Sequence, residues 1–269
     1  HISLPSGPAS VEGLGRNFVP SLASGTAGYG IDIALPPAVR GFGPSLSLDY
    51  DSGGGASEVG TGWQIGGIPS VRRRVDDGLP HFDDTDTWEL AGLGMPCDLL
   101  EVAPGVFRPE QETGAFARVK RANNGSTWEA RVKNGFTYSF GGDGFTEEED
   151  GNVYRYLLRE ANDLHGHAIN YGWDTSEGHA LLTRVTWNNF SEKTRIEVTF
   201  VYEQRPDTYE RFSSGIRQSI TQRLKSIDVT YGGGLVRRYT LGYVANPQSR
   251  LTTVDVVGTD GTTGMPGLH

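Results

Sequence analysis

The 269-residue chain carries a single cysteine, Cys97. One cysteine forms no internal disulfide, so the fold is not a disulfide scaffold. The cysteine count fits bacterial export and a reducing compartment equally well. The sequence also has no run of about 18 apolar residues, which a membrane-spanning helix needs. The net charge is −9, and the one basic cluster, Arg72–Arg74, is short. Such a chain is a poor nucleic-acid binder, because phosphate contacts dominate that affinity, and we expect the cluster to lie on a solvated strand face.

Alternation of apolar and polar residues, the pattern of a strand with one buried face, runs through most of the chain. In the stretch IEVTFVY, for example, Ile196, Val198, Phe200 and Tyr202 fall on one face. The 38 glycines follow no three-residue period, which excludes collagen. The 27 aromatic residues (11 Tyr, 11 Phe and 5 Trp) exclude a disordered chain. The composition therefore indicates a folded protein built from strands.

Turn signals separate these strands. Asn124-Gly125 and Asn134-Gly135 lie between alternating runs, and Gly232–Gly234 separates IDVTY from LVRRYTLGY. Asn-Gly pairs suit the positive φ angles of tight hairpins. Because the helices that connect parallel strands are missing, we expect an all-β fold of about eleven or twelve antiparallel strands in an array of hairpins. Alternation alone fits a curved sheet, a sandwich and a barrel equally well.

The stretch NDLHGHAINYGWD, residues 162–174, is the first candidate for chemistry. It places His165 and His167 one residue apart, just after Asp163. A zinc site needs three or four ligands, and His179 is the only other imidazole nearby. Asp, Asn and Gly favour turns, because their side chains bond the local backbone or tolerate positive φ. We therefore predict a hairpin turn with His165 at its tip, and a metal site is the weaker alternative.

Three further polar stretches are expected to be connectors. Residues 51–66, DSGGGASEVGTGWQIG, indicate a flexible loop, and Glu147–Glu149 indicate a solvated acidic loop. Asp83, Asp84 and Asp86 lie close together, as hard cations prefer, but the glycine and the bidentate Glu of an EF-hand loop are missing. We interpret this cluster as an acidic connector, with a calcium site as the alternative.

The order of several motifs resembles one known family. Residues 163–171, DLHGHAINY, are similar to the D-x-x-G-x-x-I-x-Y hairpin of YD-repeat (Rhs-type) proteins. Residues 2–36 resemble the start of the SpvB-type N-terminal domain, and residues 41–90 resemble its most characteristic block, with Gly41–Pro44 and Gly62-Trp63. GAFARVKR, WEARVKNGFTYSFG, LTRVTW, YEQRPD and LVRRYTLGY also match. The resemblance extends from Ile2 to about Gly261.

This resemblance implies a fold and a role. In the toxin complexes that contain such domains, Rhs-type sheets wind into a hollow shell around a toxic C-terminal segment, which leaves through a pore-forming component. For this chain, the resemblance implies a curved, shell-like sheet and a single SpvB-type β domain over residues 1–269, a fragment of a larger protein. An internal division of that domain near residues 100–115 is compatible with it. The expected function is a non-catalytic structural and assembly module of a secreted bacterial toxin-like protein, cytoplasmic before export. Expected partners are an Rhs/YD-repeat chain or downstream domains of the same protein, and a pore-forming toxin component. An alternative is a surface binding module in which Trp63 or Trp173 contacts a glycan or a host protein.

Enzyme motifs are incomplete. The ADP-ribosyltransferases that accompany some SpvB-type domains need a Ser-Thr-Ser strand before a Glu-x-Glu loop, and none precedes Glu147–Glu149. The Gly-x-Ser-x-Gly elbow of serine hydrolases is also missing. Cys97, with His81 upstream, is a weak nucleophile candidate and suits a small hydrophobe better. A glycosidase carboxylate pair stays open, since its members meet only in three dimensions. We expect no catalytic, cofactor-binding or metal residue and no cofactor; an enzyme would need a cleft in which histidines such as His81, His165 and His179 converge.

Overall fold

The computed structural model describes residues 19–21, 26–76, 78–93, 97–111, 114, 116–212, 214–245 and 247–268. These residues form 22 strands, and all strand pairings are antiparallel. The helical part of the described chain is limited to two short 3₁₀ segments, η1 (Val39–Gly41) and η2 (Asn123–Gly125). The all-β antiparallel prediction is therefore confirmed. The expected number of strands was too small, because many strands have only two to five residues, too few to show alternation.

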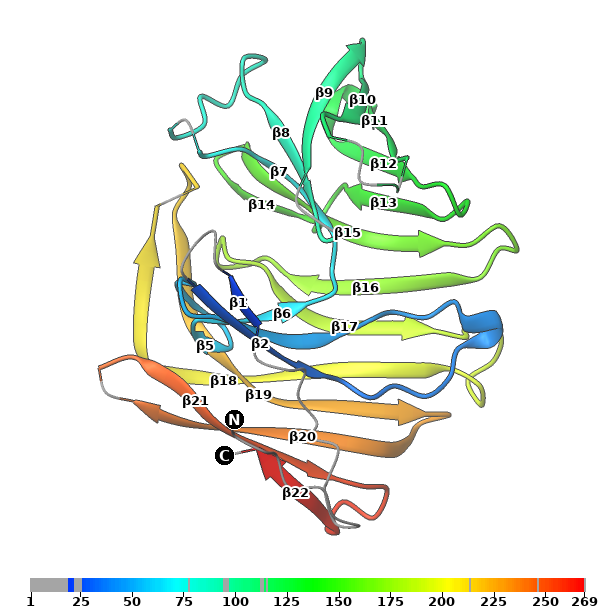
Figure 1. Cartoon of the computed structure of the whole chain (residues 1–269), viewed down its shortest axis with the longest axis vertical. Coiled ribbons are helices and arrows are strands. Elements are labelled where there is room, and N and C mark those ends of the chain that lie inside the picture. Colours follow the sequence, from blue (N-terminus) through cyan, green and yellow to red (C-terminus); the bar gives the residue numbers. More distant parts are fainter. Residues whose placement is uncertain are drawn as a thin grey trace, which may run out of the picture.

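A curved sheet of consecutive hairpins forms the long wall of the molecule (Figure 1). Its strands are β15 (Asn152–Asn162), β16 (Ala168–Asp174), β17 (Leu181–Trp187), β18 (Ile196–Arg211), β19 (Gln218–Tyr231), β20 (Gly234–Ala245), β21 (Ser249–Val257) and β22 (Gly264–Leu268). Each strand pairs with the next along the chain. The predicted alternation holds: Ile196, Val198 and Phe200 are buried, while the residues between them are partly exposed.

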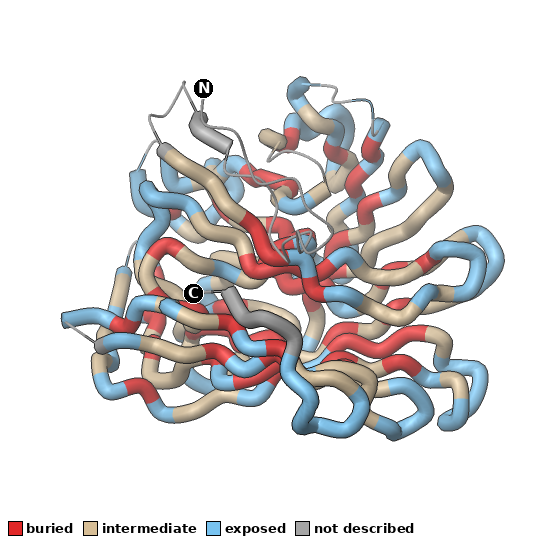
Figure 2. The backbone as a smooth tube through the Cα atoms, turned by 60° about the horizontal axis from the view of Figure 1, so that its bottom comes forward, coloured by how far each residue is buried: buried red, intermediate tan, exposed pale blue. Residues whose placement is uncertain are grey.

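A small sheet from the N-terminal part of the chain packs on this wall. Its strand order is β1 (Val19–Ser21), β2 (Thr26–Asp32), β3 (Ser47–Asp51) and β6 (Trp63–Gly66). Figure 1 shows these strands lying across the wall, and Figure 2 shows buried backbone where the layers meet. Ile31 and Leu48 are buried in this core, and the Ala34 backbone N–H donates to Tyr239 Oη of β20 at 2.8 Å.

Above the wall, eight strands close into a ring that includes β15. The others are β7 (Ser70–Arg73), β8 (Trp88–Ala91), β9 (Cys97–Ala103), β10 (Val106–Pro109), β11 (Arg118–Ala122), β12 (Thr127–Arg131) and β13 (Thr137–Gly141). Closure occurs because β15 pairs with β7 at Leu157 opposite Ser70 and with β13 at Ala161 opposite Tyr138. Trp128 lies in the core of this ring, with its ring centroid 4.9 Å from that of Trp88.

The predicted hairpin turns are confirmed where local chemistry specifies them. Asn123 and Asn124 have φ of 51° and 54° between β11 and β12. Tyr231 pairs with Gly234, so Gly232 and Gly233 alone form the turn between β19 and β20, with φ of 55° and 82°. Both positive angles match a type I′ turn, which glycine adopts without strain.

Two predicted loops are in fact paired structure. Within residues 51–66, β4 (Ala56–Ser57) pairs with β5 (Gly60–Thr61), and β6 pairs with β3. Residues Thr146–Glu149 form β14, which pairs with β15. Glycine and acidic content indicated loops, but hairpin pairing with nearby strands outweighs such residue preferences.

Candidate functional site

The loop with His165 and His167 is a hairpin turn between β15 and β16. Asp163 Oδ1 accepts the backbone N–H of His165 at 2.7 Å and that of His167 at 2.9 Å, and Asp163 Oδ2 lies 2.6 Å from His167 Nδ1. Although desolvation raises the pKa of Asp163, the hydrogen bonds from His167 and the backbone lower it to about 2. His165 Nε2 lies 3.3 Å from an Arg40 guanidinium nitrogen. The carboxylate thus organises the turn, as predicted.

The acidic loop before β8 brings together His81, Asp83 and Asp86, whose potential ligand atoms lie within 4.8 Å of one another. Asp86 accepts the backbone N–H groups of His81 at 2.9 Å and Phe82 at 2.7 Å. Asp83 Oδ1 accepts both the N–H and the hydroxyl of Thr85, at 2.8 and 2.5 Å. Calcium needs six to eight oxygen ligands, and these carboxylates already bond the loop itself. The geometry therefore matches a connector.

The prediction that Arg72–Arg74 lie on a solvated strand face is wrong for Arg73. Arg73 is buried, pairs with the Asp86 carboxylate and donates to Val153 O at 2.9 Å. Its guanidinium carbon lies 4.5 Å from the ring centroid of Trp88. A guanidinium can be buried in this way because its planar face stacks on an aromatic ring while its edges reach acceptors.

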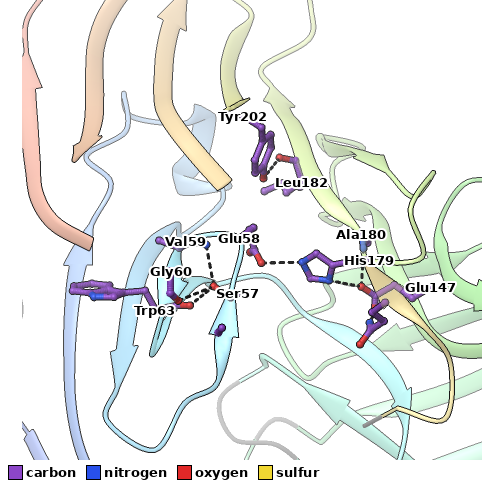
Figure 3. A network of polar contacts seen from close by, with 12 residues as sticks. Ser57, Glu58, Val59, Gly60, Trp63, Glu147, His179, Ala180, Leu182 and Tyr202 are labelled. Carbon is purple, nitrogen blue, oxygen red and sulfur yellow. Dashed lines mark hydrogen bonds and ion pairs between the residues drawn. The ribbon is translucent and has the colours of Figure 1, made fainter. Parts of the chain in front are cut away.

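The interpretation of Glu147 as a solvated loop residue is also wrong. Glu147 is 1% exposed and lies in a polar network with His179 and Glu58 (Figure 3). His179 Nε2 lies 3.0 Å from Glu58 Oε2, and His179 Nδ1 lies 3.4 Å from Glu147 Oε1, within ion-pair distance but outside hydrogen-bond geometry. The Ala180 N–H donates to Glu147 Oε1 at 2.8 Å, and Arg155 Nη2 lies 3.0 Å from the same oxygen.

The charges in this network compensate one another. Burial lowers the pKa of His179, but its two carboxylate partners outweigh this effect and raise that pKa to about 9. Burial raises the pKa of Glu147, but Arg155 and His179 lower it to about 2. The pKa of Glu58 is also lowered, because the contact with His179 outweighs desolvation. Two carboxylates therefore face one imidazolium and one guanidinium at neutral pH, a paired arrangement that burial tolerates.

The network fastens the β4–β5 hairpin to the rest of the molecule. Glu58 lies in the turn of that hairpin, and its carbonyl accepts the Leu224 N–H of β19 at 2.7 Å. Arg205, buried in β18, donates to Ser57 O at 2.9 Å, and Tyr209 Oη donates to Ala56 O. The cavity beside His179 has a volume of about 10 Å³, room for about one water molecule. The arrangement therefore joins layers and offers no room for a substrate.

The two tryptophans of the binding-module alternative pack against the core. Trp63 is half-buried beside Tyr29 and Tyr50, with ring centroids 6.2 and 5.3 Å away. Trp173 is also half-buried, and its Nε1 donates to Leu158 O at 2.8 Å. Neither ring is presented as an exposed aromatic platform, which counts against that alternative. Cys97 begins β9, with its Sγ 3.5 Å from Leu90 O.

Residues 21–103 match the family model described as SpvB, Salmonella virulence plasmid 65kDa B protein. This part of the chain is thus similar to the SpvB family. The mono(ADP-ribosyl)transferase SpvB of Salmonella typhimurium (strain 14028s) is 44% identical over 57 residues, 21% of this chain and 10% of that relative. The protein of the same name from Salmonella choleraesuis is 37% identical over 86 residues, 32% of this chain and 13% of the relative. The matched segments thus span little more than a tenth of these relatives.

Solved structures extend the similarity in fold over most of the chain. The N-terminal domain of effector protein SpvB from Salmonella typhimurium strain LT2 has a TM-score of 0.71 at 19% identity, over 85% of this chain and 98% of that one. The crystal structure of TcdB2-TccC3 has a TM-score of 0.76 at 20% identity, over 99% of this chain and 17% of that one. The structure of the Photorhabdus luminescens Tc holotoxin pore has a TM-score of 0.77 at 20% identity, over 99% of this chain and 16% of that one. These likenesses establish the fold. No helix in the described part of the chain has the length and hydropathy of a membrane span.

Proposed function

We propose that this SpvB-type domain is a non-catalytic wall and assembly module of a secreted bacterial toxin-like protein. Its curved sheet contributes to a shell that encloses a toxic partner segment, or helps to deliver it. The partners are an Rhs/YD-repeat chain or downstream domains of the same protein, and a pore-forming component. The chain is made in the cytoplasm before export.

The main support is the far end of the long wall. Among the described strands, β22 pairs with β21 alone. A strand edge with one neighbour presents unpaired N–H and C=O groups to a further strand. Because the wall from β15 to β22 grows by consecutive hairpins, a following strand would continue it in the same geometry. The likeness in fold to the toxin-complex structures supports the same reading.

The positions of the histidines support a non-catalytic role. His81 lies in the loop before β8, His165 lies at the tip of the β15–β16 turn, and His179 is buried between two carboxylates. The cleft required of an enzyme, in which these side chains converge, is not formed by the described residues. The transferase named for the Salmonella relatives is matched over about a tenth of its length, and the similar solved SpvB structure is its N-terminal domain.

A co-expression experiment tests this proposal. The tagged domain is produced together with an Rhs/YD-repeat segment that ends in a toxic C-terminal region, and the eluate is treated with protease. We expect the two chains to co-elute and the C-terminal region to resist cleavage. A version that ends at Gly258, and therefore lacks β22, is the matched control and should co-elute less while keeping its β circular dichroism spectrum. Absence of co-elution for the intact domain would refute the proposal.

A further inference from the structure

A cavity of about 370 Å³ lies where the small sheet, the ring and the wall meet. Its lining includes Asp49 of β3, Phe42 just after η1, Phe136 just before β13, Tyr138 in β13, and Tyr171 of β16. This volume lies in the range of small-molecule sites, which measure about 300–1,000 Å³. The polar network around His179 shares none of these residues. The cavity is therefore separate from that network.

The Asp49 carboxylate lacks a counter-charge in this cavity. Its Oδ1 is buried and has no hydrogen-bond donor. Among the described residues of the lining, Asp49 is the only carboxylate, and none is Lys, Arg or His. Asp49 as a whole is half-buried, but a buried carboxylate oxygen without a partner costs free energy, and folded proteins normally pair such an atom. Its other oxygen, Oδ2, lies against Gly66 of β6, where a Cβ would come within 1.9 Å of it, so only glycine leaves room for the carboxylate in this position.

Four aromatic side chains, together with small and aliphatic residues, form the rest of the lining. Phe42 and Phe136 meet edge to face, with ring centroids 4.8 Å apart. Desolvation raises the pKa of Tyr138 and Tyr171, so both hydroxyls stay protonated and neutral at physiological pH. Aromatic faces attract cations, most strongly where water is excluded. One anion among neutral aromatic rings is thus complementary to a positively charged group with an apolar surface.

We propose that this cavity binds an organic ammonium group, with the charge against Asp49 and the carbon atoms against the aromatic walls. A bare hard cation would need about six oxygen ligands, which a lining of aromatic and small residues does not provide. The ammonium group comes either from a small free amine or from a lysine side chain of a partner segment. The two sources share the same recognition chemistry and are separated by the choice of probe.

Isothermal titration at low ionic strength tests the proposal with three probes on the intact 269-residue chain. Choline represents a free amine, the peptide acetyl-Gly-Lys-Gly-amide represents a lysine side chain, and 3,3-dimethyl-1-butanol is the uncharged shape analogue of choline. We expect saturable binding of choline, of the lysine peptide or of both, and binding of the alcohol at least about tenfold weaker than that of the cation, a difference of about 1.4 kcal/mol. Saturation by only one cation identifies the source. Binding of neither cation, or equal binding of choline and the alcohol, would overturn the proposal.

Variants locate the site. Asp49→Asn keeps the shape and removes the charge, and it should weaken cation binding at least about tenfold. Asp84→Asn removes the same charge from an exposed loop outside the cavity and should leave the affinity within about twofold. Without ligand, Asp49→Asn should also raise the melting temperature, because it removes a charge that has a buried oxygen without a donor. Unchanged cation affinity in Asp49→Asn would overturn the proposal, and a lower melting temperature would show that the Asp49 carboxylate has a structural role instead.

Discussion

Replacement of His179 by asparagine should remove the charge that joins Glu58 to Glu147, and the structure sets the size of the effect. His179 has its pKa raised from 6.5 to about 9. A shift of about 2.5 units corresponds to about 3 kcal/mol at 1.36 kcal/mol per unit. Loss of one partner from a buried ion pair typically costs about 3–5 kcal/mol, which agrees. The shift of Glu147 reports the same coupled interaction and is not added. We therefore expect His179→Asn to lower the free energy of unfolding by about 3 kcal/mol near pH 6.

The pH dependence follows from the directions of the two shifts. Because the folded-state pKa of His179 is raised, its contribution is complete below pH 6.5 and is lost as pH rises through about 9. Because the pKa of Glu147 is lowered from 4.5 to about 2, its contribution is present above pH 4.5 and is lost as pH falls toward 2. The network is therefore strongest between pH 4.5 and 6.5.

Urea denaturation followed by tryptophan fluorescence measures this effect at pH 6 and pH 10. The difference between the wild type and His179→Asn should fall from about 3 kcal/mol at pH 6 to below about 1 kcal/mol at pH 10. His165→Asn is the matched control, because His165 is exposed at a hairpin tip, and it should change stability by less than about 0.5 kcal/mol at both pH values. A difference below about 1 kcal/mol at pH 6, or one that does not change with pH, would refute the reasoning.

Three further substitutions test other parts of the fold by the same denaturation assay. Arg73→Met leaves the buried Asp86 carboxylate without its cation and should lower the free energy of unfolding by about 3–5 kcal/mol. The additional change Asp86→Asn should recover part of that loss. A cost below about 1 kcal/mol for Arg73→Met would contradict the buried pair. Gly233→Ala places a Cβ at φ 82° in the β19–β20 turn and should lower the free energy of unfolding by about 1–2 kcal/mol. Gly233→Asn should lower it less, because asparagine tolerates positive φ. Equal losses for the two variants would contradict the turn geometry. Leu48→Ala leaves a cavity in the core under the small sheet and should lower the free energy of unfolding by about 2–5 kcal/mol. Leu164→Ala, at an exposed site, should lower it by less than about 0.5 kcal/mol. Similar values for the two variants would contradict the packing.

The sequence predicted the features that depend on neighbouring residues. Alternation over residues 196–202 specified a buried face, and Asn124-Gly125 specified a hairpin, because both signals lie within a few residues. The turn at Asp163 was predicted for the same reason. The division near residues 100–115 stays a prediction.

Features that depend on distant partners were not predictable in this way. Glu147 lies in an acidic, glycine-rich stretch, but it contacts His179, from the loop before β17, as well as its cross-strand partner Arg155. Glu58 follows a run of glycines that indicated a flexible loop, but His179 and the β19 backbone hold it in place. The one local sign was the phenylalanine at position 145 in the acidic stretch, since alternation places Phe145 and Glu147 on the same strand face.

The ring of eight strands makes the two ends of the long sheet different from each other. Because β7 and β13 each have a strand on both sides, the described strands leave no long edge at the ring, and the strand that stands outside it, β14, has only four residues. The ring therefore acts as a terminal cap, in the manner of the end units that stop a repeat protein from stacking further. Growth by strand addition is confined to the opposite end, so identical copies would have no matching edge at the ring and could not polymerise head to tail through this sheet.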